Sequence, residues 1–226
     1  MVVVGGRGRL GSAVTAECRR RGITVLGKQA ADPWPEAGPT MLVFDAGGIA
    51  GLSATVAFCQ RSGAGLVYAV SGVTAAAWAS LKQLADTVPV VLATNLSLGH
   101  WLQSRVGRWL ASTVRQLDTP VDASVWERHP RTKQQRPSAS ATELAEEWAA
   151  HSGAATSEVV SLRSGHAVSE HALQLDWAYE SLSVRHDVRD LRAAAAGAML
   201  ALGHAAAAAP GLIRFDTLLD QMFLGA

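Results

Sequence analysis

The first eleven residues constrain the fold of this chain more than any other segment. Val2–Val4 is a short apolar run, and glycines follow it at a regular spacing, at Gly5, Gly8 and Gly11. A glycine loop between a buried strand and a helix lets the backbone approach a pyrophosphate, and the helix N-terminus then supplies free N–H groups and partial positive charge. The spacing differs from the common GxGxxG, and glycines at such a turn can also serve tight packing alone. Its position on the first strand nevertheless favours a nucleotide-binding loop.

Strand-like and helix-like segments alternate after this loop. Apolar runs typical of short buried strands are expected at residues 23–26, 41–44, 65–70 and 88–93. Helical spacing is expected between them, at residues 12–21, 52–62 and 75–85. Strands that alternate with helices in this way indicate an α/β fold with a doubly wound parallel sheet of the Rossmann type.

The pattern changes near Asn95. The elements expected beyond it are, in order, a long helix (98–116), a strand (123–126), a basic loop (127–137), a helix (140–150), three alternating runs typical of antiparallel strands (158–162, 171–177 and 181–186), an Ala-rich helix (193–209) and a tail (213–224). We therefore expect two domains. Residues 1–96 and 188–226 are expected to form a Rossmann-type dinucleotide-binding domain, and residues 97–187 a mixed-sheet α+β domain for substrate binding and oligomerisation.

Composition narrows the classes of partner. The formal net charge is +1, from 20 Lys and Arg against 19 Asp and Glu, which gives no electrostatic case for nucleic acid or for an anionic membrane. The Ala-rich segment is too weakly apolar for a good membrane span. The chain begins directly with a strand-like run, so we expect a cytoplasmic protein without a signal peptide. Cys18 and Cys59 lack the spacing of a zinc site or a disulfide framework, and we expect both to be buried in helices, with no metal site.

The charge pattern around the expected loop favours one nicotinamide cofactor. The end of the second strand often carries a carboxylate for the ribose 2′-hydroxyl, but Lys28 stands there, and Arg7 and Arg9 lie in the glycine loop. Three cations and no carboxylate suit a 2′-phosphate, which favours NADPH, with NADH possible. The alternative is that these cations are solvated surface charges.

The segment from Glu127 to Lys133 concentrates further positive charge. It contains Arg128, His129 and Arg131 as well as Lys133, and Arg136 follows. Such a cluster suits a substrate that carries carboxylates, and a histidine beside cations can serve as an acid or hydrogen-bond donor. On the pattern alone, a solvated basic loop is the simpler interpretation.

This segment resembles the signature of the dihydrodipicolinate reductase family, E-x-H-H-x-x-K-x-D-A-P-S-G-T-A, over residues 127–141. Further family motifs follow in the same order along nearly the whole chain. They are G-x-x-G-R-M-G at 5–11, D-F-T at 45–47, G-T-T-G at 69–72, A-P-N-F-S-x-G at 93–99, S-x-R-x-G-x-x-x-G-x-H at 161–171, and a late R-H-D at 185–187.

The resemblance implies hydride transfer from a nicotinamide to a conjugated cyclic imine. In that role His129 is the general acid, and Lys133 binds and polarises the substrate. The residues expected to bind the cofactor are Gly5, Arg7, Gly8, Arg9, Leu10, Lys28, Asp45, Ala46, Ser71, Gly72 and Asn95. Those expected to bind the substrate are Arg136, Ser138, Ala139, Ser140 and Arg163. Similar proteins are tetramers built through the second sheet, so the resemblance also implies a homo-oligomer, a tetramer or dimer.

Departures from the family pattern point to an altered substrate. Pro130 replaces the second histidine, Ala139 replaces a glycine that holds a substrate carboxylate, and Ala69-Val70 replaces Gly-Thr beside the nicotinamide. We therefore expect an NADPH-dependent reductase acting on a small carboxylate-bearing cyclic imine or unsaturated heterocycle, in specialised metabolism. The alternatives are a non-redox enzyme on the same fold, for cyclisation, dehydration or isomerisation, and a silent binding protein.

The other histidines attract weaker expectations. His171 is expected to pack in a strand, and the alternative is that it lines the site. His100, His151 and His204 are expected to be ordinary helix residues.

Overall fold

The structure of this protein is a computed structural model. It describes residues 1–29, 32–36, 38, 41–117, 119–166 and 169–225. The chain divides into two compact units, one formed by Met1–Ser97 with Leu191–Ala226 and the other by Leu98–Asp190. The joint expected after residue 96 lies after Ser97, and the joint expected after residue 187 lies after Asp190.

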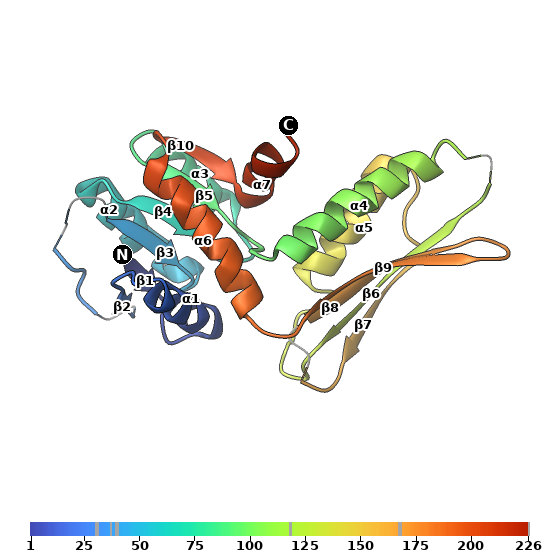
Figure 1. Cartoon of the computed structure of the whole chain (residues 1–226), viewed down its shortest axis with the longest axis horizontal. Coiled ribbons are helices and arrows are strands. Elements are labelled where there is room, and N and C mark those ends of the chain that lie inside the picture. The colour runs from blue at the N-terminus through green and yellow to red at the C-terminus, as the bar shows by residue number, and fades with distance from the viewer. Residues whose placement is uncertain (30–31, 37, 39–40, 118, 167–168, 226) are drawn as a thin grey trace. The chain divides into compact units, whose positions relative to one another are not determined.

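A six-stranded parallel sheet forms the centre of the first unit (Figure 1). Its strand order is β10-β5-β4-β3-β1-β2. The strands are β1 (Val2–Val4), β2 (Leu26–Lys28), β3 (Leu42–Asp45), β4 (Gly65–Tyr68), β5 (Pro89–Leu92) and β10 (Gly211–Arg214). The central strands are buried on both faces, which is why they consist of continuous Val, Leu and Phe runs. The α/β class expected from the sequence is confirmed.

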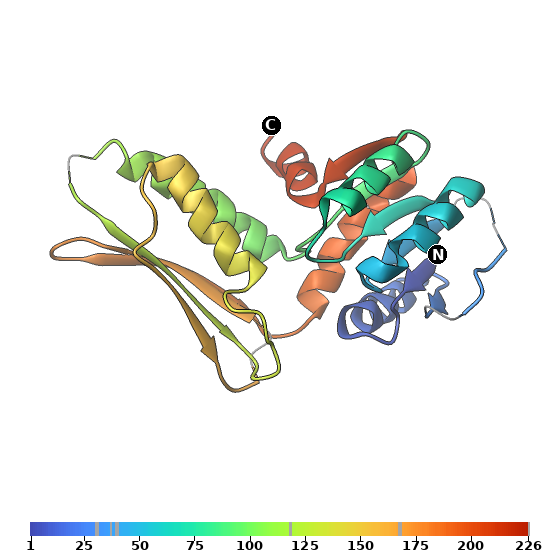
Figure 2. The ribbon, with the colours of Figure 1, turned by 180° about the vertical axis from the view of Figure 1, so that it is seen from behind.

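Helices cover both faces of this sheet, as Figures 1 and 2 show from opposite sides. Helix α6 (Arg192–Ala207) packs against α1 (Arg9–Arg20) and against β3, β4 and β5. Helix α2 (Leu52–Ser62), which follows the short 3-10 helix η1 (Ile49–Gly51), packs with α3 (Ala75–Leu84). The Ala-rich segment is thus a packed helix, as expected. No helix in the described part of the chain is long and apolar enough to cross a membrane.

Two expectations about this unit were wrong. The second strand was expected at residues 23–26 but is Leu26–Lys28, because the chain needs residues 23–25 to return from α1 before it pairs with β1. The segment from residue 213 was expected to be a tail. Instead, β10 pairs in parallel with β5 and leads into α7 (Phe215–Phe223), so this segment completes the sheet.

The second unit is a mixed four-stranded sheet covered on one face by two helices. Its strand order is β7-β6-β8-β9. The strands are β6 (Asp122–His129), β7 (Glu158–Arg163), β8 (Ser169–Asp176) and β9 (Ser181–Val188), and the helices are α4 (Leu98–Val114) and α5 (Ala139–Ser152). Leu110 of α4 and Trp148 of α5 pack on Val125, Leu173 and the other inward residues of the sheet.

This sheet differs from expectation in two respects. Strand β6 was expected to end at residue 126 but runs to His129, so Glu127 and His129 belong to the strand and not to a loop. Strand β7 pairs in parallel with β6, whereas all three late strands were expected to be antiparallel. Helix α5 makes the crossover between β6 and β7, and such a connection produces a parallel pair.

Gly197 permits close packing inside the first unit, and we predict that a methyl group there is destabilising. A Cβ at Gly197 would lie 1.9 Å from the carbonyl oxygen of Leu96, so Gly197→Ala should lower the free energy of unfolding by about 1–3 kcal/mol. Gly203 lies in the same helix, and a Cβ there would meet no other atom within 4 Å, so Gly203→Ala should stabilise by about 0.5–1 kcal/mol. Urea denaturation of both variants measures this. Equal effects at the two positions would contradict the packing role.

Candidate functional site

The glycine loop of the first unit requires glycine for steric reasons. Gly5 has φ +74°, and a Cβ there would lie 2.8 Å from the carbonyl oxygen of Ala46. A Cβ at Gly11 would lie 2.3 Å from the carbonyl oxygen of Gly5. Gly8 is the N-cap of α1, it makes no side-chain cap, and the first turn contains no acidic residue. The helix N-terminus therefore keeps backbone N–H groups and a favourable dipole for an anion.

A cavity of about 370 Å³ lies beside this loop. Its lining residues come from the ends of β1 and β2, from the loop after β2, from the segment between β3 and α2, and from the first turn of α2: Val4, Gly5, Lys28, Gln29, Trp34, Gly47, Ala50, Gly51, Ala54 and Thr55. The cavity therefore lies at the carboxyl ends of strands where the strand order reverses, between β1 and β3. Ligands of open α/β sheets bind at this kind of crevice.

Lys28 is buried beside this cavity and is not a solvated surface charge. Its Nζ donates to the carbonyl oxygen of Gln29 at 2.8 Å and to that of Asp32. Nζ also lies 4.8 Å from the ring centre of Trp34, and that ring stacks on Phe58 at 4.3 Å. The ammonium group is thus held in place by the loop after β2. Arg7 and Arg9, in contrast, are exposed.

The other residues expected to bind the cofactor lie around the same strand ends. The buried carboxylate of Asp45 accepts from the Gly47 N–H at 2.8 Å and from Thr55 Oγ1 at 2.6 Å. Burial raises the pKa of this carboxyl above its ordinary value, although both hydrogen bonds oppose the change. Asp45 therefore shapes the loop that contacts Gly5, and Ala46 in that loop approaches Gly5 directly.

The remaining expected cofactor residues are spread over three elements. Leu10 lies half-buried in the first turn of α1. Ser71 and Gly72 are exposed after β4, and Gly72 has φ +72°. Asn95 follows β5 and accepts from the Ser97 N–H at 2.9 Å.

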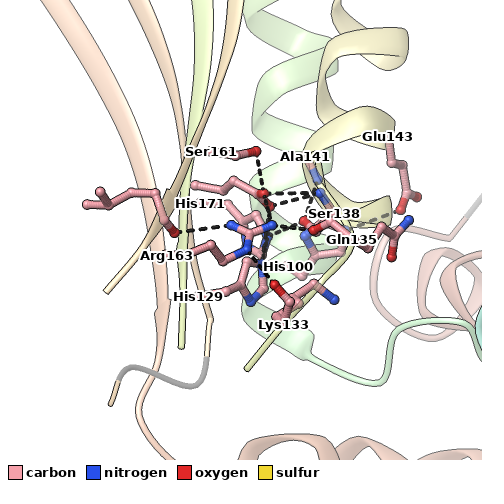
Figure 3. Close-up of polar contacts among 12 residues, drawn as sticks. His100, His129, Lys133, Gln135, Ser138, Ala141, Glu143, Ser161, Arg163 and His171 are labelled. Atoms are coloured by element: carbon pink, nitrogen blue, oxygen red, sulfur yellow. Dashed lines mark hydrogen bonds and ion pairs between the residues drawn. The ribbon is translucent and has the colours of Figure 1, made fainter. Parts of the chain in front are cut away.

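The second unit contains a buried polar cluster, which strand register explains. Alternation along β6 directs Glu127 and His129 to the same, helix-covered face. On the neighbouring strands, Ser161 of β7 and His171 of β8 pair with Glu127, and Arg163 of β7 pairs with His129. Figure 3 shows His129, Ser138, Arg163 and His171 converging.

Glu127 is the centre of this cluster and is wholly buried. Its Oε1 accepts from Ser161 Oγ at 2.7 Å and from the Arg163 guanidinium at 2.8 Å. Both oxygens also lie 3.1 Å from the backbone nitrogen of Ser138. Burial raises the pKa of Glu127, but the hydrogen bonds from Ser138, Ser161 and Arg163 outweigh it and lower this pKa to about 2. Glu127 is therefore ionised at neutral pH.

Two histidines lie near the other carboxylate oxygen of Glu127, Oε2. His129 Nε2 lies 3.2 Å from Glu127 Oε2, and His171 Nε2 lies 3.7 Å from the same atom. The two Nε2 atoms are 3.3 Å apart, and Ser138 Oγ lies 3.1 Å from His171 Nε2. Burial, together with nearby His100 and His129, lowers the pKa of His171 to about 3. His171 is therefore neutral, and its Nε2 can accept from the Ser138 hydroxyl.

The expected substrate residues fall into two groups. Ser138 and Arg163 are buried in the cluster: Ser138 caps α5, and Arg163 also donates to the carbonyl oxygens of Lys133 and Gln135. Arg163 therefore holds the loop before α5. Lys133 and Ser140 are half-buried, and Arg136 and Ala139 are exposed. Ala139 and Ser140 form the first turn of α5, where backbone N–H groups face outward.

Two residues that the sequence did not single out belong to this cluster. His100 was expected to be an ordinary helix residue, but it is buried, its Nε2 lies 3.4 Å from Glu143 Oε2, and its ring centre is 6.1 Å from that of His171. Glu127 appeared only as the first letter of a motif, without a role. Alternation along residues 123–129 was the one signal that could have placed its side chain inside.

Glu127, His129 and His171 also have the residue types and closeness that could hold a metal ion, because their ligand atoms lie within 4.8 Å of one another. No metal was expected from the sequence. The carboxylate is already bound by the cation of Arg163 and by hydroxyl and N–H donors, so its charge is largely compensated without an ion. We therefore interpret the group as a hydrogen-bonded cluster.

His171 should make stability depend on pH, and we predict the sign. Its pKa is about 3 in the folded protein and about 6.5 when unfolded, so the unfolded chain binds more protons below pH 6.5. Stability should therefore fall from pH 6.5 to 4.5, by at most about 1.4 kcal/mol per pH unit for this group. His171→Asn should flatten that decline in urea denaturation, while His166→Asn, at an exposed position, should not. Identical slopes in all three proteins would disprove the assignment.

Comparisons with known proteins point to one family. Residues 105–219 match the family described as dihydrodipicolinate reductase, C-terminus. A 4-hydroxy-tetrahydrodipicolinate reductase of Stenotrophomonas maltophilia (strain R551-3) is 31% identical, over 75% of this chain and 69% of that protein. One of Myxococcus xanthus is 34% identical, over 68% of this chain and 62% of that protein.

A solved structure shows the same fold. The dipicolinate-bound dihydrodipicolinate reductase of Paenisporosarcina sp. TG-14 matches with a TM-score of 0.73 and 14% identity, over 94% of this chain and 96% of that one. The matched family region contains Glu127, His129 and His171 of the buried cluster. This chain is a member of the dihydrodipicolinate reductase family.

Proposed function

We propose that the protein is an NADPH-dependent reductase that transfers hydride to a small cyclic imine or unsaturated heterocycle bearing at least one carboxylate. The observation that carries this proposal is the buried Glu127–His129 pair next to the Lys133 loop and the N-terminus of α5. Membership of a reductase family supports the redox class. The substrate and the preference for NADPH are the new elements of the proposal.

The first unit has the features that a nicotinamide dinucleotide needs. When bound, this cofactor supplies the hydride. The tight turn formed by Gly5, Gly8 and Gly11 suits a pyrophosphate, because a Cβ at Gly5 or Gly11 would clash with backbone oxygens and prevent the turn that presents the N-terminus of α1. The cavity between Lys28 and Ala54 fits the adenosine half, with Trp34 as an apolar wall. Buried Lys28 and exposed Arg7 supply positive charge for a 2′-phosphate.

The second unit has groups for a carboxylate substrate. Lys133 and Arg136 offer cations on the loop before α5, and the first turn of α5 at Ala139 and Ser140 offers backbone N–H groups and a hydroxyl. Arg163 anchors this loop through the carbonyl oxygens of Lys133 and Gln135. We therefore assign Arg163 to holding the substrate loop rather than to contacting the substrate.

His129 has the chemistry of the acid in this reaction. A substrate nitrogen becomes more basic as hydride arrives, so an acid placed near it stabilises the transition state. Lys133, on the loop that follows β6, can hold a substrate carboxylate and polarise the ring. The replacement of a second histidine by Pro130, with neither charge nor donor, supports a substrate other than that of the named relatives, in specialised metabolism. A cytoplasmic homo-oligomer, a tetramer or dimer, is also proposed.

Cofactor binding tests the redox class directly. We predict that the purified protein binds NADPH more tightly than NADH in a fluorescence titration. The double variant Arg7→Ala and Lys28→Ala should weaken NADPH about tenfold or more and NADH much less, because only NADPH carries the 2′-phosphate. Lys82→Ala is the control variant: it also removes a cation, but from α3 and not from the glycine loop or β2. Failure to bind either dinucleotide would exclude a reductase and favour a non-redox enzyme or a binding protein.

Turnover tests the acid. We predict that His129→Asn lowers kcat for NADPH-dependent reduction of a dicarboxylate cyclic imine by about 10²–10⁴-fold, because the proton donor is lost. Lys133→Ala should mainly raise KM. Lys82→Ala again serves as the control. Unchanged kcat in His129→Asn would remove His129 from the mechanism.

A further inference from the structure

We propose that Glu127 is the positioning residue for His129: its carboxylate fixes the ring through Nε2 and stabilises the imidazolium, whose Nδ1–H is the proton delivered to the substrate. This inference rests on the proposed role of His129 as the acid. Glu127 and His129 are two residues apart on β6, so their side chains share one face of the sheet.

The two oxygens of Glu127 have different partners. Oε1 is held by Ser161 at 2.7 Å and by Arg163 at 2.8 Å, from the neighbouring strand β7. Oε2 lies 3.2 Å from His129 Nε2. A carboxylate whose first oxygen is fixed in this way presents the second in one direction. Carboxylates commonly fix the tautomer and orientation of a functional histidine by such a contact.

The contacts of the cluster allow an arrangement of protons in which Glu127 accepts from His129 Nε2–H. His129 Nε2 and His171 Nε2 are 3.3 Å apart, so one must donate and the other accept. The Ser138 hydroxyl, 3.1 Å from His171 Nε2, can donate to it. If His171 accepts, His129 Nε2–H can donate to both Glu127 and His171. The neutral His129 ring then carries its proton on Nε2, and a second proton goes to Nδ1.

The charges around His129 decide how firmly it holds the second proton. Glu127 on β6 contributes the closest charge. His171 on β8 is neutral, and Arg163 on β7 is paired with Glu127. Lys133 lies on the loop that follows β6. His100 on α4 has its ring centre 6.1 Å from that of His171 and its Nε2 3.4 Å from Glu143 of α5. His186 on β9 pairs with His171. The anion in direct contact therefore favours the imidazolium over the neutral ring.

Proton and nitrogen NMR of the histidine rings, in the full chain without substrate, tests the positioning role. The His129 signals are assigned by their loss in His129→Asn. We expect neutral His129 in the wild type to be protonated at Nε2. In Glu127→Gln, its titration midpoint should fall by about one pH unit or more. An Nδ1–H tautomer in the wild type would overturn the proposal even if the variant does not fold, and an unchanged midpoint in a folded variant would do so too.

Two further measurements separate positioning from a structural role. Ser161→Ala removes one hydrogen bond to Oε1 but keeps the charge, so its His129 midpoint should stay near that of the wild type. In Glu127→Gln, kcat should fall with KM little changed, and the alkaline limb of the kcat–pH profile should move to lower pH. A Glu127→Gln profile that loses height without moving would refute the electrostatic role. The NMR result does not depend on turnover, so a failure of the reductase proposal can be told apart from a failure of the positioning role of Glu127.

Discussion

The buried carboxylate of Glu127 is the interaction on which the second unit depends. It joins β6 to β7 through Ser161 and Arg163, and β6 to the start of α5 through the Ser138 N–H. A buried ion is costly unless its lone pairs are all satisfied, because it gives up its hydration. Here the donors to Glu127 come from His129 on β6, from β7 and from the start of α5, so the cost is offset only when these elements are assembled together. The same requirement fixes the position of the proposed acid, His129.

Much of the fold followed from local patterns in the sequence. The β1–glycine–α1 unit was predicted from Gly5, Gly8 and Gly11, because steric demands on a strand-to-helix turn act within a few residues. The parallel sheet was predicted from the alternation of strands and helices, which is also a pattern of neighbouring segments along the chain. Strand ends were less accurate. β2 lies later than expected and β6 is longer, since pairing with neighbours decides where a strand ends.

The candidate site was only partly predictable. His129, Lys133 and Ser138 were found through a resemblance carried by one continuous segment, and the structure places all three on or beside the same strand and helix. The contacts of His129 were not predicted, although His171 was correctly expected in a strand and was named as a residue that could line the site. His171 lies on another strand, and only the register Glu127–His171 brings it to Glu127, which a sequence pattern does not reveal. His100 was missed because helical spacing predicts which face of the helix carries it but not which strand packs against that face. Lys28 was found by position, but its carbonyl partners lie in a loop without a pattern.

The insertion of one unit into the sequence of the other has a consequence for how the chain is made. Residues of Leu98–Asp190 are continuous, so this unit has all its parts as soon as α5, β8 and β9 have left the ribosome. The first unit lacks α6 and β10 until residues 192–214 are synthesised. Until then the edge of β5 that pairs with β10 has no partner strand. Domains generally fold as they emerge from the ribosome. The inserted unit can therefore fold during translation, whereas the Rossmann-type sheet is completed only afterwards. Truncation before α6 would leave folding of the inserted unit intact and would prevent completion of the Rossmann-type sheet.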